Sequence, residues 1–220
     1  MKIKKIIEGF CPPYFFKILQ KLIHYLKNDK RMTLFGGDED LFKKLSRETK
    51  IYGEYGSGQS TIWMAKNTDA LIISADTSSS WSKKIKTLNS KHNMKVIYCV
   101  VDCGEIIGWG YPLDYSKRDN FQNYFNSIWN KKNLKPDTIL IDGRFRLACF
   151  FTCLLNSEPG TKIIFDDYVN RPHYHIVEEY ITPIDYCGRQ ALFVTPQKES
   201  MRYTLEQIKR EVSNFKYVFN

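Results

Sequence analysis

The sequence lacks any apolar run that approaches the roughly 20 residues of a transmembrane helix. Its six cysteines form no C-x-x-C pair and no histidine cluster lies near them, which argues against a zinc site and a disulfide framework. We therefore expect buried free thiols and a cytoplasmic location. Glu8 and Pro12-Pro13 interrupt the apolar run after the basic start, and no small-residue cleavage site follows, so we expect no signal peptide.

The composition is that of an ordinary globular domain. The 220 residues, 43% of them hydrophobic and including 14 Tyr and 14 Phe, suffice for one sizeable domain with a partly aromatic core. The net charge of +9 comes from lysines spread along the chain. Such a surface fits simple solvation, anionic substrates or an anionic membrane surface. We rank nucleic acid below these partners because no recognisable RNA-binding motif is present.

Residues 1–48 are predicted to form an N-terminal helical cap or lid segment. Pro12-Pro13 suits a helix start, and apolar residues follow at helical spacing. These are Phe15, Ile18, Leu19, Leu22, Ile23 and Leu26. We favour packing of this helix onto the main domain, with a lid over the substrate site or peripheral contact with a membrane surface as alternatives.

Residues 49–220 are predicted to form the main domain, in which strands alternate with helices. The expected strands are residues 51–56, 70–76, 94–102, 137–143 and 161–167. Their continuous apolar runs are typical of parallel strands covered by helices on both faces. Residues 181–187 and 191–196 flank Gly188-Arg189 as an antiparallel hairpin. The predicted fold is a doubly wound, Rossmann-like α/β sheet of seven strands, mostly parallel with a C-terminal antiparallel hairpin.

Acidic residues stand at the carboxyl end of every predicted parallel strand. They are Glu54, Asp76, Asp102, Asp142 and the pair Asp166-Asp167. A single aspartate in this position is usually a helix cap or turn residue. Because ligands bind beyond the carboxyl ends of strands in a doubly wound sheet, the succession indicates a binding site along one rim.

The motif E-x-G-x-G-x-S, from Glu54 to Ser60, with Asp76 after the next strand, resembles class I S-adenosylmethionine-dependent methyltransferases over residues 50–196. The dinucleotide pattern G-x-G-x-x-G is not met, because Thr61 occupies its last position. The acidic residue before the glycines also favours the methyl donor over a pyrophosphate.

This resemblance implies S-adenosylmethionine as cofactor and a role for each rim residue. Gly56 and Gly58 would let the backbone approach the donor, and Glu54 would face its ammonium group. Asp76 would accept both ribose hydroxyls, and Asp102 would lie near the adenine. Trp81 would flank the adenosine or belong to the core. The full expected donor site is Glu54, Gly56, Ser57, Gly58, Ser60, Thr61, Asp76, Trp81, Asp102 and Asp142.

Residues 142–146, DGRFR, and the DDY…R…Y pattern beginning at Asp166 resemble a small branch of the same methyltransferases. Arg144 and Arg146 fall inside the first signature. A buried arginine is costly unless it is paired. Two interpretations stay open. Either Arg144 or Arg146 pairs with Asp166 or Asp167, or the arginines recognise an anion through the guanidinium fork.

Asp142, Asp166 and Asp167 also resemble the ligand positions of cation-dependent O-methyltransferases, which implies a possible Mg²⁺ site. Two departures weaken this similarity. Asp167 stands where those enzymes have asparagine, and Phe145 stands where they have a lysine base. Arg144 is an electrostatic alternative to the cation.

Methylation of a hydroxyl needs a proton acceptor, and His173 and His175 are the first candidates. Asp142 and Asp166 are the alternatives, and with Arg144 they complete the candidate catalytic set. The resemblance implies O-methylation of a small hydroxylated or anionic metabolite, or of a surface-polysaccharide precursor. An RNA-binding or RNA-methylating protein and a catalytically inactive member of the fold are the competing hypotheses.

Overall fold

The computed structural model describes residues 33–219 of the 220-residue chain. The predicted N-terminal helix lies outside these residues, as does Cys11. The described end of the predicted cap segment contains η1 (Phe35–Gly37) and α3 (Asp40–Ser46). Phe42 of α3 packs against Tyr52 and Trp63, with ring centroids 5.9 and 5.6 Å apart. The proposed boundary at residues 48/49 stays a prediction, although α3 packs directly on the main domain.

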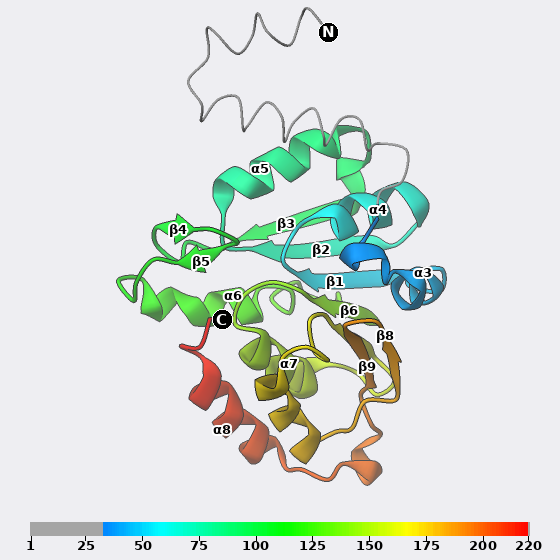
Figure 1. Cartoon of the computed structure of the whole chain (residues 1–220), viewed down its shortest axis with the longest axis vertical. Helices are drawn as coiled ribbons and strands as arrows, with labels where there is room; N and C mark the ends of the chain where they lie inside the picture. Colours follow the sequence, from blue (N-terminus) through cyan, green and yellow to red (C-terminus); the bar gives the residue numbers. More distant parts are fainter. Residues whose placement is uncertain (1–32, 220) are drawn as a thin grey trace, which may run out of the picture. The chain divides into compact units, whose positions relative to one another are not determined.

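A seven-stranded sheet forms the centre of the domain, in the order β3-β2-β1-β6-β7-β9-β8 (Figure 1). The first five strands in this order are parallel, and β9 runs antiparallel to both β7 and β8. This arrangement confirms the predicted fold class. The strands are β1 (Ile51–Tyr55), β2 (Leu71–Asp76), β3 (Val96–Val100), β6 (Thr138–Ile141), β7 (Lys162–Phe165), β8 (Asp185–Cys187) and β9 (Gln190–Val194).

Helices cover both faces of the sheet. Tyr52 of β1 points toward α3, whereas Tyr55 points the other way and packs on Tyr124 of α6, 5.7 Å between ring centroids. The face that carries α3 also carries α4, and the opposite face carries α6 and α7. The helices are α4 (Gln59–Asn67), α5 (Ser79–Leu88), α6 (Phe121–Asn126), α7 (Arg146–Asn156) and α8 (Leu205–Phe215), with the 3₁₀ segments η2 (Ser90–Lys95), η3 (Arg118–Asn120), η4 (Pro172–Glu179) and η5 (Lys198–Ser200).

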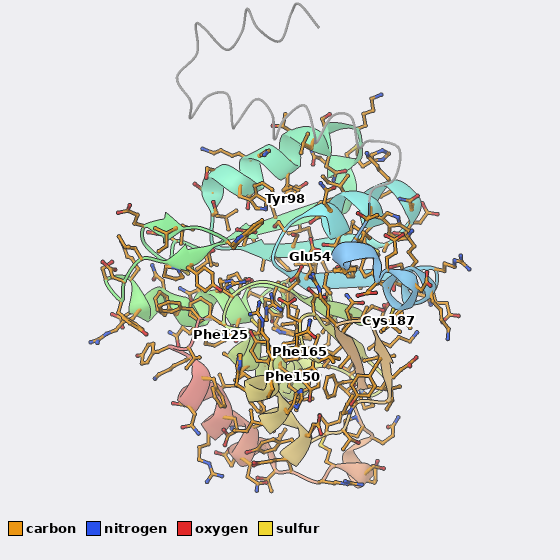
Figure 2. The ribbon with its side chains drawn as sticks, in the orientation of Figure 1. Glu54, Tyr98, Phe125, Phe150, Phe165 and Cys187 are labelled. Atoms are coloured by element: carbon orange, nitrogen blue, oxygen red, sulfur yellow. The ribbon has the colours of Figure 1, made fainter. Side chains whose placement is uncertain are left out.

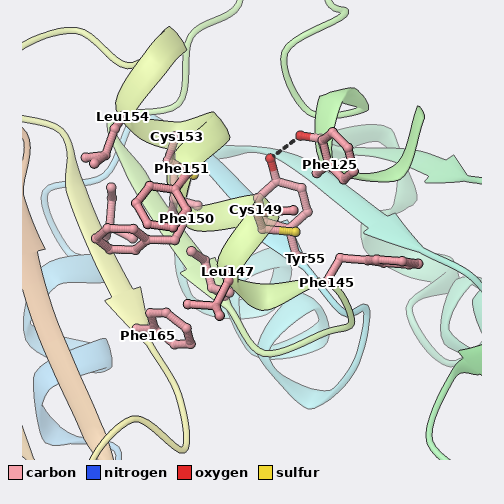
Figure 3. Close-up of a cluster of buried hydrophobic side chains, with 14 of the residues drawn as sticks. Tyr55, Phe125, Phe145, Leu147, Cys149, Phe150, Phe151, Cys153, Leu154 and Phe165 are labelled. Atoms are coloured by element: carbon pink, nitrogen blue, oxygen red, sulfur yellow. Dashed lines mark hydrogen bonds between the residues drawn. The ribbon is translucent and has the colours of Figure 1, made fainter. Parts of the chain in front are cut away.

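Aromatic side chains fill the core between the sheet and α7, as the composition predicts (Figure 3). Phe150 of α7 packs on Phe193 with ring centroids 4.8 Å apart, and Phe151 stacks on Phe215 of α8. The buried Tyr55 hydroxyl donates to the Phe125 carbonyl at 2.6 Å, so this polar atom is satisfied. The cysteines of the described region are free thiols, and no helix there is both long and apolar enough to span a bilayer.

A short hairpin, β4 (Ile106–Ile107) and β5 (Tyr111–Pro112), lies between the predicted strands 94–102 and 137–143, where the sequence predicts no strand. Gly108 and Gly110 have φ of +52° and +88°, values that favour glycine and allow the tight reversal. Two-residue strands are too short to leave a periodic pattern. The hairpin lies beyond the carboxyl ends of β2 and β3, and so it borders the rim where the acidic residues gather (Figure 1).

Candidate functional site

The glycine-rich loop after β1 has one closed and one open side. A Cβ on Gly56, at φ +99°, would lie 2.9 Å from the backbone of Gly143. Gly56 is thus required by the close approach of the loop after β6, a partner that the sequence did not indicate. At Gly58 a Cβ would meet nothing within 4 Å. The open space beside Gly58 is where a ligand can approach the backbone.

Glu54 lies in the interior beneath this loop and has no exposed surface (Figure 2). Its carboxylate accepts hydrogen bonds from the hydroxyls of Tyr52 at 3.1 Å and Ser60 at 2.8 Å, and from the Thr61 hydroxyl. Burial raises its pKa, and the hydroxyl bonds oppose that rise. The Thr61 hydroxyl also accepts the Gly58 N–H at 2.8 Å. Glu54 therefore ties the loop to the first turn of α4, and its direct contact with a donor ammonium stays a prediction.

Asp76, at the end of β2, joins the loop from the other side. Its carboxylate accepts the Ser57 N–H at 3.0 Å and the Ser78 N–H at 2.7 Å, and its residue is 7% exposed. Burial raises the pKa of Asp76, whereas the backbone bonds lower it. The Trp81 indole N–H donates to the Ser57 carbonyl at 2.7 Å. Asp76, Ser57 and Trp81 therefore form one hydrogen-bonded unit, which agrees with their expected proximity.

Asp102 stands apart from this unit. It is exposed, and its carboxylate accepts the Gly104 N–H at 3.0 Å and lies 3.5 Å from the Lys117 ammonium. These two groups hold the pKa of Asp102 below its ordinary value. Its partners belong to the segment around the hairpin, so the predicted contact with the adenine rests on its strand-end position alone.

Asp142, Asp166 and Asp167 converge at the ends of β6 and β7, with carboxylate oxygens that all lie within 4.8 Å of one another. Three arginines pair with them. Asp166 is completely buried and receives the Arg189 fork at 3.0 and 2.7 Å. The remaining pairs are Arg146–Asp142 (3.1 Å), Arg146–Asp167 (3.1 Å), Arg171–Asp167 (2.8 Å) and Arg189–Asp167 (3.3 Å).

In the structure Arg146 forms ion pairs with aspartates, whereas Arg144 does not. Arg146 is 2% exposed and paired with Asp142 and Asp167. Arg144 is also buried, but it stacks on the Tyr111 ring, with its Cζ atom 4.1 Å from the ring centroid. Arg189 was missed by the sequence reasoning. Its only signal was its place in the hairpin turn beside the strand that ends in Asp166.

Asp142 is the most accessible member of the acidic cluster, with a side chain 33% exposed. Burial and the neighbouring Asp166 carboxylate raise the pKa of Asp142 to about 8, and Arg146 opposes that rise. A carboxyl group with a pKa of about 8 is mostly protonated at neutral pH, and its ionised fraction, which grows as the pH rises toward 8, is a strong proton acceptor. Asp166 cannot take this role as readily, because both its oxygens are held by Arg189 and none of its surface is exposed.

The two histidines lie on η4 and have different neighbours. His173 is exposed, with its ring 4.3 Å from the Tyr174 ring. Partial burial and the guanidinium groups of Arg171 and Arg146 lower its pKa. The lowered pKa favours the neutral imidazole that can accept a proton. His175 instead packs on Tyr168, and a ring nitrogen lies 3.2 Å from the Tyr168 carbonyl. His173 is thus the histidine beside the arginine–aspartate cluster.

The three aspartates could hold a metal ion by their spacing, but arginines compete with it, so the predicted divalent cation stays a prediction. Three carboxylates face three guanidinium groups, so the group has no excess negative charge. Mg²⁺ prefers free oxygen ligands and retains several waters, whereas here the oxygens of the fully buried Asp166 are already bonded to Arg189. The arginines that neutralise the cluster are Arg146, Arg171 and Arg189, whereas the sequence offered Arg144 as the alternative to the cation.

We expect the thermal unfolding midpoint to stay the same when millimolar Mg²⁺ or Mn²⁺ is added, and when EDTA replaces the cation. The reason is that a cation would have to displace bidentate arginine pairs that are largely shielded from water. Differential scanning fluorimetry at constant ionic strength measures this, with Na⁺ at matched ionic strength as control. A saturable, Mg²⁺-dependent rise in the midpoint would show that the aspartates bind metal after all.

Comparison with solved structures supports this fold. The chain is similar to a methyltransferase-like protein from Silicibacter pomeroyi, with 27% identity over 83% of this chain and 96% of that one, and a TM-score of 0.69. An O-methyltransferase from Bacillus cereus in complex with SAH has 18% identity over 89% and 97%, with a TM-score of 0.50. No protein-family model matches the sequence, and no curated protein matches it. The sheet order and these similarities show that the chain has the fold of class I S-adenosylmethionine-dependent methyltransferases.

Proposed function

We propose that the protein transfers a methyl group from S-adenosylmethionine to a hydroxyl of a small acceptor. The observation that carries this proposal is the unit of Asp76, Ser57 and Trp81 beside the open side of Gly58. A buried carboxylate at the end of β2 suits the two hydroxyls of a ribose. The open backbone at Gly58 suits the amino-acid end of the donor. The B. cereus structure was solved with SAH, which agrees with the same ligand class.

The bound donor supplies an activated methyl group on a sulfonium sulfur, so the protein needs to align the acceptor and keep water out. Asp76 would fix the ribose, because the Ser57 and Ser78 N–H groups hold its carboxylate in place. Glu54 would act through the loop, since it anchors Ser60 and Thr61 at the start of α4. Removal of water is consistent with the burial of both carboxylates.

The acceptor hydroxyl must lose its proton as the methyl group arrives. Asp142 is our first candidate for the proton acceptor, because it is partly exposed at the rim and has a raised pKa. His173 is the second, because its lowered pKa keeps it neutral beside the cluster. For the acceptor we propose a small hydroxylated or anionic molecule, of which a surface-polysaccharide precursor is one example. Dispersed positive charge favours an anionic acceptor.

Calorimetry with SAH and NAD⁺, followed by a methyl-transfer screen, tests this function. We expect SAH to bind and NAD⁺ not to bind at matched concentration, because the loop departs from the dinucleotide pattern at Thr61. The protein is then incubated with labelled S-adenosylmethionine and a panel of hydroxylated carboxylates, sugar phosphates and nucleotide sugars, and mass spectrometry detects products that gained a methyl group. Preference for NAD⁺ would reject the proposal. SAH binding without transfer to any acceptor would favour an inactive member of the fold.

A further inference from the structure

Arg144 is a buried cation without a matching anion in the described part of the chain. It lies in the loop between β6 and α7 and is 6% exposed, and its Nε and Nη1 atoms are buried without a hydrogen-bond partner. No described carboxylate lies within ion-pair distance of it, whereas the nearby Arg146 and Arg189 are both paired. A buried guanidinium with unused donors is costly, so it calls for a specific reason.

The surroundings of Arg144 hold it in a fixed orientation. Its guanidinium carbon lies 4.1 Å from the centroid of the Tyr111 ring, a stacking distance that leaves the N–H donors at the edge of the guanidinium plane. The Arg144 backbone N–H donates to the Tyr124 hydroxyl at 3.3 Å. The side chain is therefore oriented by an aromatic face, while its Nε and Nη1 donors have no hydrogen-bond partner.

The β4–β5 hairpin packs against this arginine through Gly110 and Tyr111. A Cβ on Gly110 would stand 3.8 Å from Arg144 Cγ and 3.2 Å from the Thr77 hydroxyl. That hydroxyl donates to the Gly110 carbonyl at 2.9 Å, so the hairpin is tied to the residue next to Asp76. Arg144 and Tyr111 therefore meet at the same rim as the proposed donor site. The hairpin tip carries Trp109, which is 87% exposed and faces solvent, from which an acceptor enters.

We propose that Arg144, stacked on Tyr111, binds a carboxylate or phosphate group of the acceptor. The guanidinium has two donors, Nε and Nη1, without a hydrogen-bond partner, and an oxyanion beside it would supply the countercharge that the described residues do not. We expect the amino-acid end of the donor to lie at Gly58. Arg144 contacts the hairpin instead, so we assign the oxyanion at Arg144 to the acceptor and not to the donor. Assignment of the oxyanion to the acceptor rests on the proposed function, but binding of an oxyanion at Arg144 does not.

The test uses inorganic phosphate as the probe and three variants of the full chain. Arg144→Met removes the charge with little change of volume, and Arg144→Lys keeps the charge but removes the fork. Arg47→Met is the matched control, because Arg47 is exposed and precedes β1 at the opposite edge of the sheet. Thermal unfolding and calorimetry are measured against phosphate at constant ionic strength, with and without saturating SAH.

We expect phosphate to stabilise the wild-type protein and Arg47→Met in a saturable manner. Arg144→Met should lose at least tenfold in phosphate affinity, and Arg144→Lys should lose part of it. Without phosphate, Arg144→Met should unfold at a higher temperature than the wild type, because an unpaired buried charge has been removed. Equal phosphate responses in the wild type and Arg144→Met, or no response in the wild type, would overturn the proposal. If Arg144→Met does not fold, Arg144→Lys and Tyr111→Leu provide the same comparison.

A second comparison separates an oxyanion of the acceptor from the carboxylate of the donor. SAH has that carboxylate and 5′-methylthioadenosine lacks it. If Arg144→Met binds both as the wild type does, and phosphate still binds in the presence of SAH, the acceptor assignment stands. If the variant loses affinity for SAH alone and SAH displaces phosphate, the oxyanion belongs to the donor and the acceptor assignment fails. If phosphate binds but SAH does not, the proposed methyltransferase function fails while the oxyanion site remains.

Discussion

Asp76→Asn is expected to lower the affinity for SAH by a factor of ten to a hundred. Asp76 is the buried acid at the end of β2, and Ser57 and Ser78 N–H groups fix its carboxylate. A hydrogen bond to a charged group is worth about 1.5–3 kcal/mol, and about 1.4 kcal/mol corresponds to a tenfold change. Asparagine keeps the size of the side chain but has only one acceptor oxygen. Isothermal calorimetry with SAH measures the loss.

The matched control is Asp69→Asn, which carries the same change of charge. Asp69 is fully exposed and pairs with Lys95 on the surface, so its substitution should leave SAH affinity unchanged. The affinity for 5′-methylthioadenosine should fall in Asp76→Asn by the same factor as for SAH, because that ligand keeps the ribose. An unchanged affinity in a folded Asp76→Asn protein would show that the donor does not use this carboxylate. A loss for SAH alone would move Asp76 to the amino-acid end of the donor.

The parallel sheet could be predicted from the sequence because its strands are apolar runs separated by helix-length segments. The predicted strand of residues 161–167 agrees closely with β7 (Lys162–Phe165). The hairpin β4–β5 could not be predicted from the sequence, because each of its strands has two residues and its turn depends on Gly108 and Gly110 at positive φ. Short elements held by a tertiary contact, here Thr77 with Gly110, leave no periodic signal.

The rim of acidic residues was also predictable, because parallel strands end at one edge of the sheet. The convergence of Asp142 with Asp166 follows from that rule alone. The arginines that pair with these aspartates were not predictable from the sequence. Arg189 reaches Asp166 only because β9 returns antiparallel beside β7, and this depends on the tertiary fold. In the same way, the close approach of Gly56 to Gly143 joins two loops that are far apart in the sequence.

Arg146→Met is expected to destabilise the domain by about 3–5 kcal/mol, the usual cost of breaking a buried ion pair from one side. All three guanidinium nitrogens of Arg146 are bonded. They donate to the Gly143 carbonyl, to the Asp166 and Asp142 carbonyls, and to the Asp142 and Asp167 carboxylates. Methionine would remove all of these bonds, and Asp142 would lose its ion-pair partner, whereas Asp167 would keep Arg171 and Arg189. For a domain of this size the melting temperature should fall by roughly 6–20 °C.

Urea unfolding with Arg210→Met as control measures this loss. The Arg210 side chain is 67% exposed, so its removal should change the free energy of unfolding by less than about 0.5 kcal/mol. Adding Asp142→Asn to Arg146→Met should recover part of the loss, because Arg146 is the one ion-pair partner that the described residues give Asp142. Arg146→Met should lower the unfolding temperature, whereas Arg144→Met should raise it, because Arg146 has ion-pair partners that lose their countercharge and Arg144 has none. A loss below about 1 kcal/mol in Arg146→Met, or no recovery in the double variant, would mean that the arginine–aspartate cluster does not hold the rim together.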